Sequence, residues 1–278
     1  MRLGISSFAF GWAVGTPAPP AGRAFTADTL LDFAIAQRVP VIQFGDHIAL
    51  DAQTPEELAA FATRARDAGV AIETGARGLT AEHLHRYIGV SRQLDARVLR
   101  FVIDAKAYEP SFADIVTIIR EALPALRAAD LTLGIENHDR LSCATLRRLI
   151  DTLASEHVGI CLDTANSLGA GEGIGEVLAQ LAPVCVNLHV KDYAIERLSY
   201  LMGFTITGRA LGEGALPLDH VLDAVAPYGR CTTAIVETWP PPEPEISATL
   251  AKEQRWAESS VARLRAALAE RIATTQAP

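Results

Sequence analysis

The chain has 278 residues, and its 33 acidic side chains outnumber its 25 lysines and arginines, which gives a formal net charge of −8. The basic residues are scattered, whereas a nucleic-acid-binding domain usually carries a basic patch, so we expect no nucleic-acid partner. Hydrophobic residues make up 49% of the chain, enough for a sizeable core, but no apolar run reaches the roughly 18 residues of a membrane span, so we expect no membrane partner.

The start of the chain and its cysteines indicate a cytoplasmic protein. The polar pair Ser6-Ser7 interrupts the apolar start, and proline-rich sequence follows where a signal peptide would have a small-residue cleavage site. No two cysteines form a CxxC pair, and three of the four lie in apolar strand-like runs, which is typical of buried reduced thiols. The cysteines are Cys143, Cys161, Cys185 and Cys231.

Short apolar, β-rich runs alternate along the chain with helical patterns, at a spacing of roughly thirty residues. We expect strands at residues 3–8, 39–44, 70–74, 98–103, 131–136, 158–163, 184–189 and 233–238. Eight strands that alternate with helices fit an α/β fold of the (β/α)8 TIM barrel type better than an open sheet. No composition break divides the chain, so we expect a single domain over residues 1–278.

Helix starts are well marked between these strands. Thr54-Pro55-Glu56-Glu57 combines an N-cap, a proline in the first helical position and a capping-box acid. Gly69, just before the third strand, is typical of a helix C-terminus. The last helix is expected from about residue 248 to 272. Further expected N-caps are Thr80, Ser111, Ser142 and Ser247.

Three long segments follow predicted strand ends and therefore lie on the catalytic face of a barrel. Proline clusters occur at residues 15–20, after the first strand, and at 240–242, after the eighth. Each is either part of a lid or a stiff surface connection, and the sequence leaves both interpretations open. The third segment, residues 191–217, follows the seventh strand.

Four apolar, strand-like runs in the second half of the chain each end in a side chain that can bind a metal: Glu136, Asp163, His189 and Glu237. Taken singly, a strand-end acid often caps the following helix, but four such ends in succession indicate a common site. Parallel strands of one barrel bring their carboxyl ends to the same rim. Three carboxylates and one imidazole suit a hard or borderline divalent cation. We therefore expect one divalent metal ion, Mn²⁺ by preference, with Mg²⁺ or Co²⁺ as alternatives.

The residues around these strand ends resemble motifs of the xylose isomerase-like barrel superfamily, over essentially the whole chain. The motifs are Ile-Glu-Asn-His at 135–138, Leu-Asp-Thr-Ala-Asn at 162–166, Leu-His-Val-Lys-Asp at 188–192 and Val-Glu-Thr-Trp at 236–239. The superfamily includes ketose 3-epimerases, hydroxypyruvate isomerase, inosose dehydratase and apurinic endonucleases. The resemblance implies that Glu136, Asp163, His189 and Glu237 bind one metal, and that Glu136 and Glu237 also act as an acid/base pair.

Six further side chains are expected to bind the substrate. The resemblance implies this for Asn166, three residues after the metal-binding aspartate, and for Arg209, before a Gly-x-Gly turn. His47 and His138 follow the second and fifth strands, although His47 fits a turn equally well. Arg100 is either a partner for an acidic substrate group or a paired charge inside the barrel, and Arg197 lies in the long segment after the seventh strand.

A ketone beside a hydroxyl can chelate a divalent cation, which stabilises the enediolate that forms when the α-proton leaves. We therefore expect an isomerase or epimerase of a small ketose or oxo-sugar. The alternative is a lyase on the same scaffold, because dehydration and decarboxylation pass through a similar enolate: an inosose-type dehydratase, or a 3-oxo sugar acid decarboxylase such as the 3-oxo-isoapionate decarboxylase type. A barrel that only binds sugar is a third interpretation.

A role in DNA repair does not fit the residues at the site. Endonuclease-type members of the superfamily hold three zinc ions with a larger set of histidines. This chain has Asn166 three residues after Asp163 and lacks the histidine-x-histidine pair after the seventh strand. We expect a small carbohydrate or sugar acid as the partner. A homo-oligomer stays open, because related barrels often associate and one sequence identifies no interface.

Overall fold

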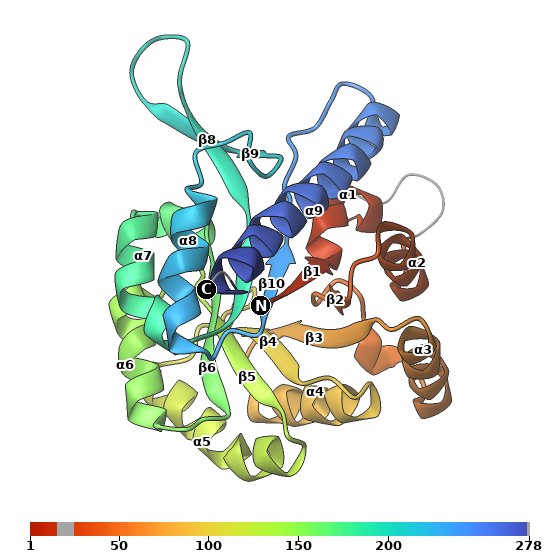
Figure 1. Ribbon diagram of the computed structural model, residues 1–278. Coiled ribbons are helices and arrows are strands. Elements are labelled where there is room, and N and C mark those ends of the chain that lie inside the picture. The colour runs from red at the N-terminus through yellow and green to blue at the C-terminus, as the bar shows by residue number, and fades with distance from the viewer. Residues whose placement is uncertain (16–24, 277–278) are drawn as a thin grey trace.

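Eight parallel strands close into a barrel in the order β1-β10-β7-β6-β5-β4-β3-β2, in a computed structural model that describes residues 1–15 and 25–276. Helices surround this barrel (Figure 1). The strands are β1 (Arg2–Ser6), β2 (Val41–Gln43), β3 (Ala71–Arg77), β4 (Val98–Val102), β5 (Thr132–Glu136), β6 (Val158–Asp163), β7 (Cys185–Val190) and β10 (Thr233–Val236). The predicted (β/α)8 barrel is confirmed.

Each expected run overlaps one barrel strand, and only the boundaries differ. β3 continues to Arg77, three residues beyond the expected end. β10 ends at Val236, so Glu237 is the first residue after its strand rather than part of it. Every residue of β6 and of β7 is buried, as parallel strands covered on both faces require.

The connecting helices are α2 (Ala27–Gln37), α3 (Pro55–Asp67), α4 (Ala81–Gln93), α5 (Phe112–Ala128), α6 (Cys143–Leu153), α7 (Ile174–Leu181), α8 (Leu218–Val225) and α9 (Ile246–Gln276). The N-caps expected at Thr54, Thr80, Ser111 and Ser142 are confirmed, each accepting a backbone N–H with its hydroxyl. Gly69 follows α3 with a φ of 71°, as expected for a helix C-terminus.

The N-cap expected at Ser247 is wrong, because α9 already begins at Ile246. The carbonyl of Glu245 accepts the first helical hydrogen bonds, from the N–H groups of Ala248 and Thr249. The Thr249 hydroxyl in turn accepts a hydrogen bond from the N–H of Glu243, 2.8 Å away. Thr249, in the first turn of α9, thus fixes the segment that precedes the helix.

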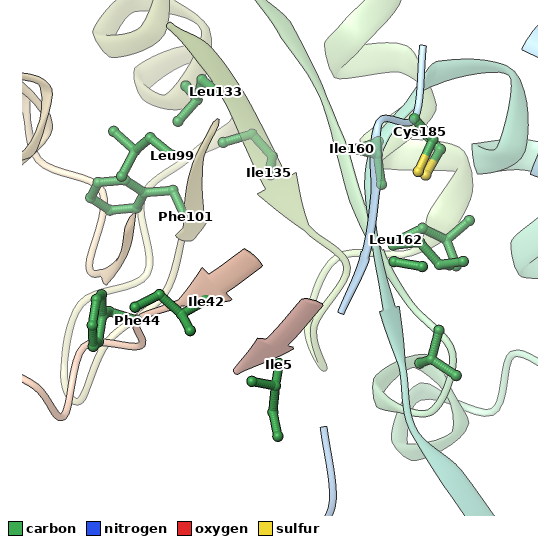
Figure 2. Close-up of a cluster of buried hydrophobic side chains, with 14 of the residues drawn as sticks. Ile5, Ile42, Phe44, Leu99, Phe101, Leu133, Ile135, Ile160, Leu162 and Cys185 are labelled. Atoms are coloured by element: carbon green, nitrogen blue, oxygen red, sulfur yellow. The ribbon is translucent and has the colours of Figure 1, made fainter. Parts of the chain in front are cut away.

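The hydrophobic core lies between the barrel and its helices. Figure 2 shows part of it, with side chains such as Phe44, Leu99 and Phe101. Leu133 and Ile135 of β5 belong to this core, whereas Gly134 and Glu136 alternate with them and point to the other side of the sheet. All four cysteines are free and buried, as expected.

A two-stranded antiparallel hairpin, β8 (Asp192–Arg197) and β9 (Phe204–Arg209), was not predicted. It occupies much of the long segment after β7 and projects from the barrel (Figure 1). Its apolar side chains are unusually exposed, up to 77% for Met202. They are Ile195, Tyr200, Leu201, Met202, Phe204 and Ile206.

The two proline clusters stay undecided between lid and stiff connection. Residues 16–20 of the first lie outside the described residues, and residues 240–242 form neither helix nor strand. Within the described part of the chain, no helix combines the length and apolar character that a membrane span requires.

Candidate metal centre and active site

The four side chains predicted to bind a metal come together inside the barrel. Glu136 and Asp163 are the last residues of β5 and β6, His189 lies one residue before the end of β7, and Glu237 follows β10. All four are buried. Nδ1 of His189 lies 3.4 Å from a Glu237 oxygen, 3.6 Å from a Glu136 oxygen and 3.8 Å from an Asp163 oxygen.

The donor atoms in this cluster suit a divalent cation. Among the described residues, His189 Nδ1 and Glu237 Oε1 are buried without a hydrogen-bond partner, and the buried Asp163 Oδ2 has the Lys191 ammonium 2.9 Å away. One ligand atom from each of Asp163, His189 and Glu237 lies within 4.8 Å of the others. Buried polar atoms without partners are costly, and a cation bound at this point would satisfy the two free atoms and share Asp163 Oδ2. Two carboxylates and an imidazole, joined by Glu136, match the ligand set of metals such as Mn²⁺ or Mg²⁺.

Cys161 lies close enough to Glu136 and His189 to join an alternative ligand set. Burial and the nearby Glu136 raise the pKa of its thiol well above the ordinary value. The thiol donates a hydrogen bond to Asn187 Oδ1, 3.1 Å away. Metals bind the thiolate, so Cys161 would have to give up this proton, whereas the carboxylates and the imidazole can offer lone pairs directly. The oxygen and imidazole set is therefore the better candidate.

Lys191 brings a cation to the edge of the cluster. Its Nζ lies 2.9 Å from Asp163 Oδ2 and 2.9 Å from Glu237 Oε2. Burial alone would raise the pKa of both carboxyls, but Lys191 and His189 hold that of Asp163 well below its usual range and lower that of Glu237 to about 2. The structure thus pairs Lys191 with two predicted metal ligands.

Glu136 is held by hydrogen bonds to both of its oxygens. Arg100 donates from Nε to Oε2, and Asn166 donates from Nδ2 to Oε1 over 2.7 Å. The Arg100 side chain is only 3% exposed, and its Nη1 lies 3.6 Å from Asp46. Arg100 is therefore a paired charge inside the barrel, and a direct contact with substrate stays a prediction. Asn166 also accepts a hydrogen bond from Lys191, at 3.3 Å.

The two histidines predicted to bind substrate lie near the site. His138 lines a cavity of about 230 Å³ together with Asn166, Ile206 and Trp239. Its Nε2 lies 3.3 Å from Arg77 Nη2. His47 packs edge-on against Phe8, and neither of its ring nitrogens has a hydrogen-bond partner within the described part of the chain. Burial lowers the pKa of His47, which favours the neutral ring.

The other two predicted substrate residues lie on the hairpin. Arg209 forms an ion pair with Glu196 at 2.7 Å, and Arg197 donates to the carbonyl of Leu201 at 2.9 Å. Within the described residues, neither guanidinium forms an ion pair or hydrogen bond with a predicted metal ligand. Their binding of substrate stays a prediction. It would require either that the hairpin moves toward the metal ligands or that the substrate extends from those ligands to the hairpin.

A second cavity, of about 270 Å³, adjoins the metal cluster, and sequence reasoning missed most of its wall. It is lined by Phe8, Gly11, Trp12, Lys191, Glu237, Thr238, Trp239, Pro240 and Glu253. Trp12 and Trp239 are fixed by hydrogen bonds from their indole N–H groups to the carbonyls of Pro240 and Asp192. The one available signal was Trp239, two residues after Glu237. The sequence around Trp12 and Glu253 carried no such signal, because only the folded chain brings these two residues to the cavity.

Asp192 and Gln43 were also missed. Asp192 accepts hydrogen bonds from four backbone N–H groups and so fixes the Gly-x-Gly turn after the hairpin. Gln43 is a buried polar residue within the apolar run of β2, which was a signal in itself, and its Oε1 lies 2.6 Å from His189 Nε2.

Comparisons with known proteins agree with this architecture. The family model for the xylose isomerase-like TIM barrel matches residues 49–267. The chain is 32% identical to 3-oxo-isoapionate decarboxylase from Pectobacterium atrosepticum over 262 residues, which cover 94% of each protein.

Solved structures show the same fold at low identity. A D-psicose 3-epimerase crystallised with D-fructose superposes with a TM-score of 0.71 at 16% identity, covering 96% of this chain and 99% of the other. A xylose isomerase-like barrel from Mycobacterium smegmatis in complex with magnesium gives a TM-score of 0.67 at 14% identity, with 94% and 96% covered. As its motifs predicted, the chain belongs to the xylose isomerase-like TIM barrel family.

Proposed function

We propose that this protein is a divalent-metal-dependent enzyme of carbohydrate metabolism that decarboxylates a 3-oxo sugar acid. The observation that carries the proposal is the cluster of Glu136, Asp163, His189 and Glu237, whose buried donor atoms converge beside an aromatic-walled cavity. The similarity to a 3-oxo-isoapionate decarboxylase along nearly the whole chain supports this choice of reaction. We propose Mn²⁺ as the ion, with Mg²⁺ or Co²⁺ as alternatives, and a cytoplasmic location, which the free cysteines support.

In this reaction the bond between the carboxylate and its neighbouring carbon breaks. Carbon dioxide leaves, the electron pair enters an enolate, and one proton is added to that carbon. A divalent cation held by Glu136, Asp163, His189 and Glu237 would supply a Lewis acid for the developing negative charge. No proton has to be removed from carbon, so one donor is sufficient.

The side chains at the site match this requirement for a single donor. Both oxygens of Glu136 already accept hydrogen bonds, from Arg100 and Asn166, so Glu136 is badly placed to take a proton from carbon. Lys191 lines the aromatic-walled cavity beside Glu237 and carries an ammonium group. We assign to Lys191 the proton that replaces carbon dioxide, after which the amine regains a proton from water.

The wall of the same cavity favours loss of carbon dioxide. Phe8, Trp12, Trp239 and Pro240 present mainly apolar surface there. A carboxylate that turns into such a wall loses hydration, whereas the departing carbon dioxide is uncharged. The aromatic faces also suit the C–H faces of a sugar chain.

The second candidate is the isomerase or epimerase. It is supported by the presence of both predicted acid/base residues, with oxygens of Glu136 and Glu237 at 3.6 Å and 3.4 Å from the same His189 nitrogen. In that reaction one carboxylate removes a proton from carbon and the other returns it. Glu136 would first have to give up its hydrogen bond to Arg100 or to Asn166.

The deciding experiment supplies Mn²⁺-loaded protein with 3-oxo sugar acids, ¹³C-labelled in the carboxylate, and with ketoses, in D₂O. We expect labelled carbon dioxide, one deuterium at the former carboxyl-bearing carbon, and unchanged ketoses. Deuterium exchange or conversion of ketoses without carbon dioxide would establish the second candidate instead. No reaction with any compound, at confirmed metal loading, would contradict both.

A substitution of Glu237 tests whether the cluster is the reaction centre. Glu237→Gln keeps the shape of the side chain but removes a charged ligand and a partner of Lys191. We expect turnover to fall by about 10²-fold or more, because the change weakens the metal site and removes the carboxylate that positions Lys191, the proposed proton donor. Circular dichroism and metal content, measured on the same sample, separate loss of chemistry from loss of fold or of metal. Turnover near the wild-type rate would remove Glu237 from the mechanism.

A further inference from the structure

We infer that Gln43 is the positioning residue of the metal centre: its side-chain oxygen fixes the orientation and tautomer of His189, so that Nδ1 presents a lone pair to the cation. The inference rests on the proposed metal site but not on the identity of the substrate. Gln43 lies on β2 and His189 on β7, and β1 and β10 separate these strands in the barrel. The contact between them therefore crosses the barrel interior.

The hydrogen bond between the two side chains is short and buried. Gln43 Oε1 and His189 Nε2 are 2.6 Å apart, and both residues are almost completely inaccessible. A hydrogen bond of this length needs one donor and one acceptor. The question is which of the two atoms carries the hydrogen, because an imidazole nitrogen can play either part.

The surroundings of the Gln43 amide answer this question. Its Nε2 donates to Glu73 Oε2 at 2.9 Å and to Asn187 Oδ1 at 3.0 Å. Turning the amide over would place its oxygen against both of those oxygens and lose two buried hydrogen bonds. The Gln43 oxygen must therefore face His189, where it can only accept.

The Asn187 amide is fixed in the same way, which makes the network consistent. Its Nδ2 donates to Glu73 Oε2 at 3.0 Å and to the Thr233 hydroxyl at 2.7 Å. The Thr233 hydroxyl donates to the other Glu73 oxygen at 2.8 Å. Asn187 Oδ1 is thereby left as the acceptor for Gln43. A chain of buried hydrogen bonds thus starts at Glu73 and ends at the imidazole.

The direction of this hydrogen bond determines which ring nitrogen of His189 is free to bind a cation. Because Gln43 accepts, His189 Nε2 carries the hydrogen, and Nδ1 is the nitrogen left to bind a cation. Nδ1 is the ring nitrogen near Glu136, Asp163 and Glu237, and no described residue forms a hydrogen bond with it. Partners of this kind hold a metal-binding histidine in place, and losing one typically lowers metal affinity about 10- to 100-fold.

The test replaces Gln43 by methionine, which has a similar length but cannot accept the hydrogen bond. Mn²⁺ binding is measured by calorimetry on the full-length wild-type and Gln43→Met proteins, without substrate. We expect the dissociation constant to rise about 10- to 100-fold in the variant. The matched control is Ser91→Ala, which removes another buried hydrogen bond, 2.6 Å long, between Ser91 and Thr74. We expect the control to bind Mn²⁺ as wild type does.

A measurement on the unaltered protein covers the case in which Gln43→Met does not fold. ¹⁵N NMR of histidine-labelled wild-type protein, loaded with diamagnetic Mg²⁺, is expected to show a protonated Nε2 and a metal-perturbed Nδ1 for His189. A metal on Nε2, or equal affinity in the folded Gln43→Met variant and wild type, would overturn the inference alone. A wild-type protein that binds no divalent cation would overturn the proposed metal-dependent function as well.

Discussion

At the scale of single residues, the feature with the widest consequences is the ammonium of Lys191 between two predicted metal ligands. It lies 2.9 Å from oxygens of both Asp163 and Glu237, and its side chain is only 14% exposed. Without a metal, the Lys191 ammonium compensates the negative charge of the buried carboxylates. With a metal bound, the ammonium and the metal ion compete for Asp163 Oδ2. Lys191 therefore stabilises the metal-free protein at the expense of metal affinity.

This competition predicts opposite effects of Lys191→Met on two quantities. The free energy of unfolding of the metal-free protein should fall by about 3 kcal/mol, because two buried carboxylates lose their partner. Affinity for Mn²⁺ should rise. Urea unfolding in the presence of a chelator and calorimetric titration measure the two effects. Lys252→Met, which removes an ion pair with Glu243, is the control and should cost less than about 1 kcal/mol. A drop in Mn²⁺ affinity would contradict the competition.

The residues of the site differed in how far the sequence could reveal them. Glu136, Asp163, His189 and Glu237 could be found because each follows an apolar run, and the closure of a barrel then brings the run ends together. The contacts of Gln43 and Lys191 depend on which side chains face each other across the barrel. That arrangement follows from strand register and side-chain packing, and neither can be deduced from a single sequence.

At the scale of elements, the hairpin β8–β9 shows the same limit. Its strands alternate in sequence, but their apolar side is largely exposed rather than packed on the core, so no burial pattern marked it. The connecting residues also lack an Asn-Gly or Asp-Gly signal, and the turn instead has positive φ angles at Leu201 and Gly203. The eight barrel strands, in contrast, are continuous buried runs. Their existence could be predicted, while their ends shifted by a few residues.

The position of the hairpin over the site depends on Gly208. A Cβ there would collide with the carbonyl oxygen and ring of Trp239, which helps to line both cavities. Gly208→Ala should therefore displace the hairpin and lower kcat/KM by about 10- to 100-fold, while Mn²⁺ affinity stays unchanged. Steady-state kinetics and calorimetry test the two expectations. Gly175→Ala in α7, where an added Cβ meets no atom within 4 Å, is the control and should leave both quantities as in wild type.

The link between α9 and the short helix α1 (Gly11–Val14) predicts a pH effect on stability. Both oxygens of the buried Glu253 accept backbone N–H groups, from Trp12 at 2.8 Å and Ala13 at 3.0 Å. Burial nevertheless raises the pKa of Glu253 from its ordinary 4.5 to about 7. The folded protein therefore holds this proton more tightly than the unfolded chain, and stability falls as pH rises between these two values.

Glu253→Gln removes this dependence of stability on pH, because a glutamine side chain does not titrate. As pH rises from 4.5 to 8, the unfolding free energy of the variant minus that of wild type should increase by about 3 kcal/mol. Urea unfolding of both proteins across this range measures the difference, in which the contributions of all other groups cancel. A difference that does not change with pH would mean that Glu253 keeps an ordinary pKa.

At the scale of the whole molecule, the metal centre joins neighbouring parts of one closed sheet. Its four proposed ligands come from β5, β6, β7 and the end of β10, which are consecutive in the barrel. A cation held there binds only the folded chain, so it should stabilise the barrel as a unit. At a free Mn²⁺ concentration 100 times the dissociation constant, the expected gain is about 2.7 kcal/mol. For a chain of 278 residues, that corresponds to a rise in Tm of about 5 °C.

Calorimetric melting with Mn²⁺ and with chelator tests this expectation, and Asp163→Asn separates site binding from a general salt effect. The variant keeps the shape of the side chain but lacks the charge that a divalent cation requires, so its Tm should respond much less to Mn²⁺. Because all four ligands lie on strands of one sheet or directly after them, the wild-type transition should stay single as it shifts. An equal shift in the variant would place the stabilising ion elsewhere on this acidic protein. A transition that splits would show that the ligands do not belong to one cooperative unit.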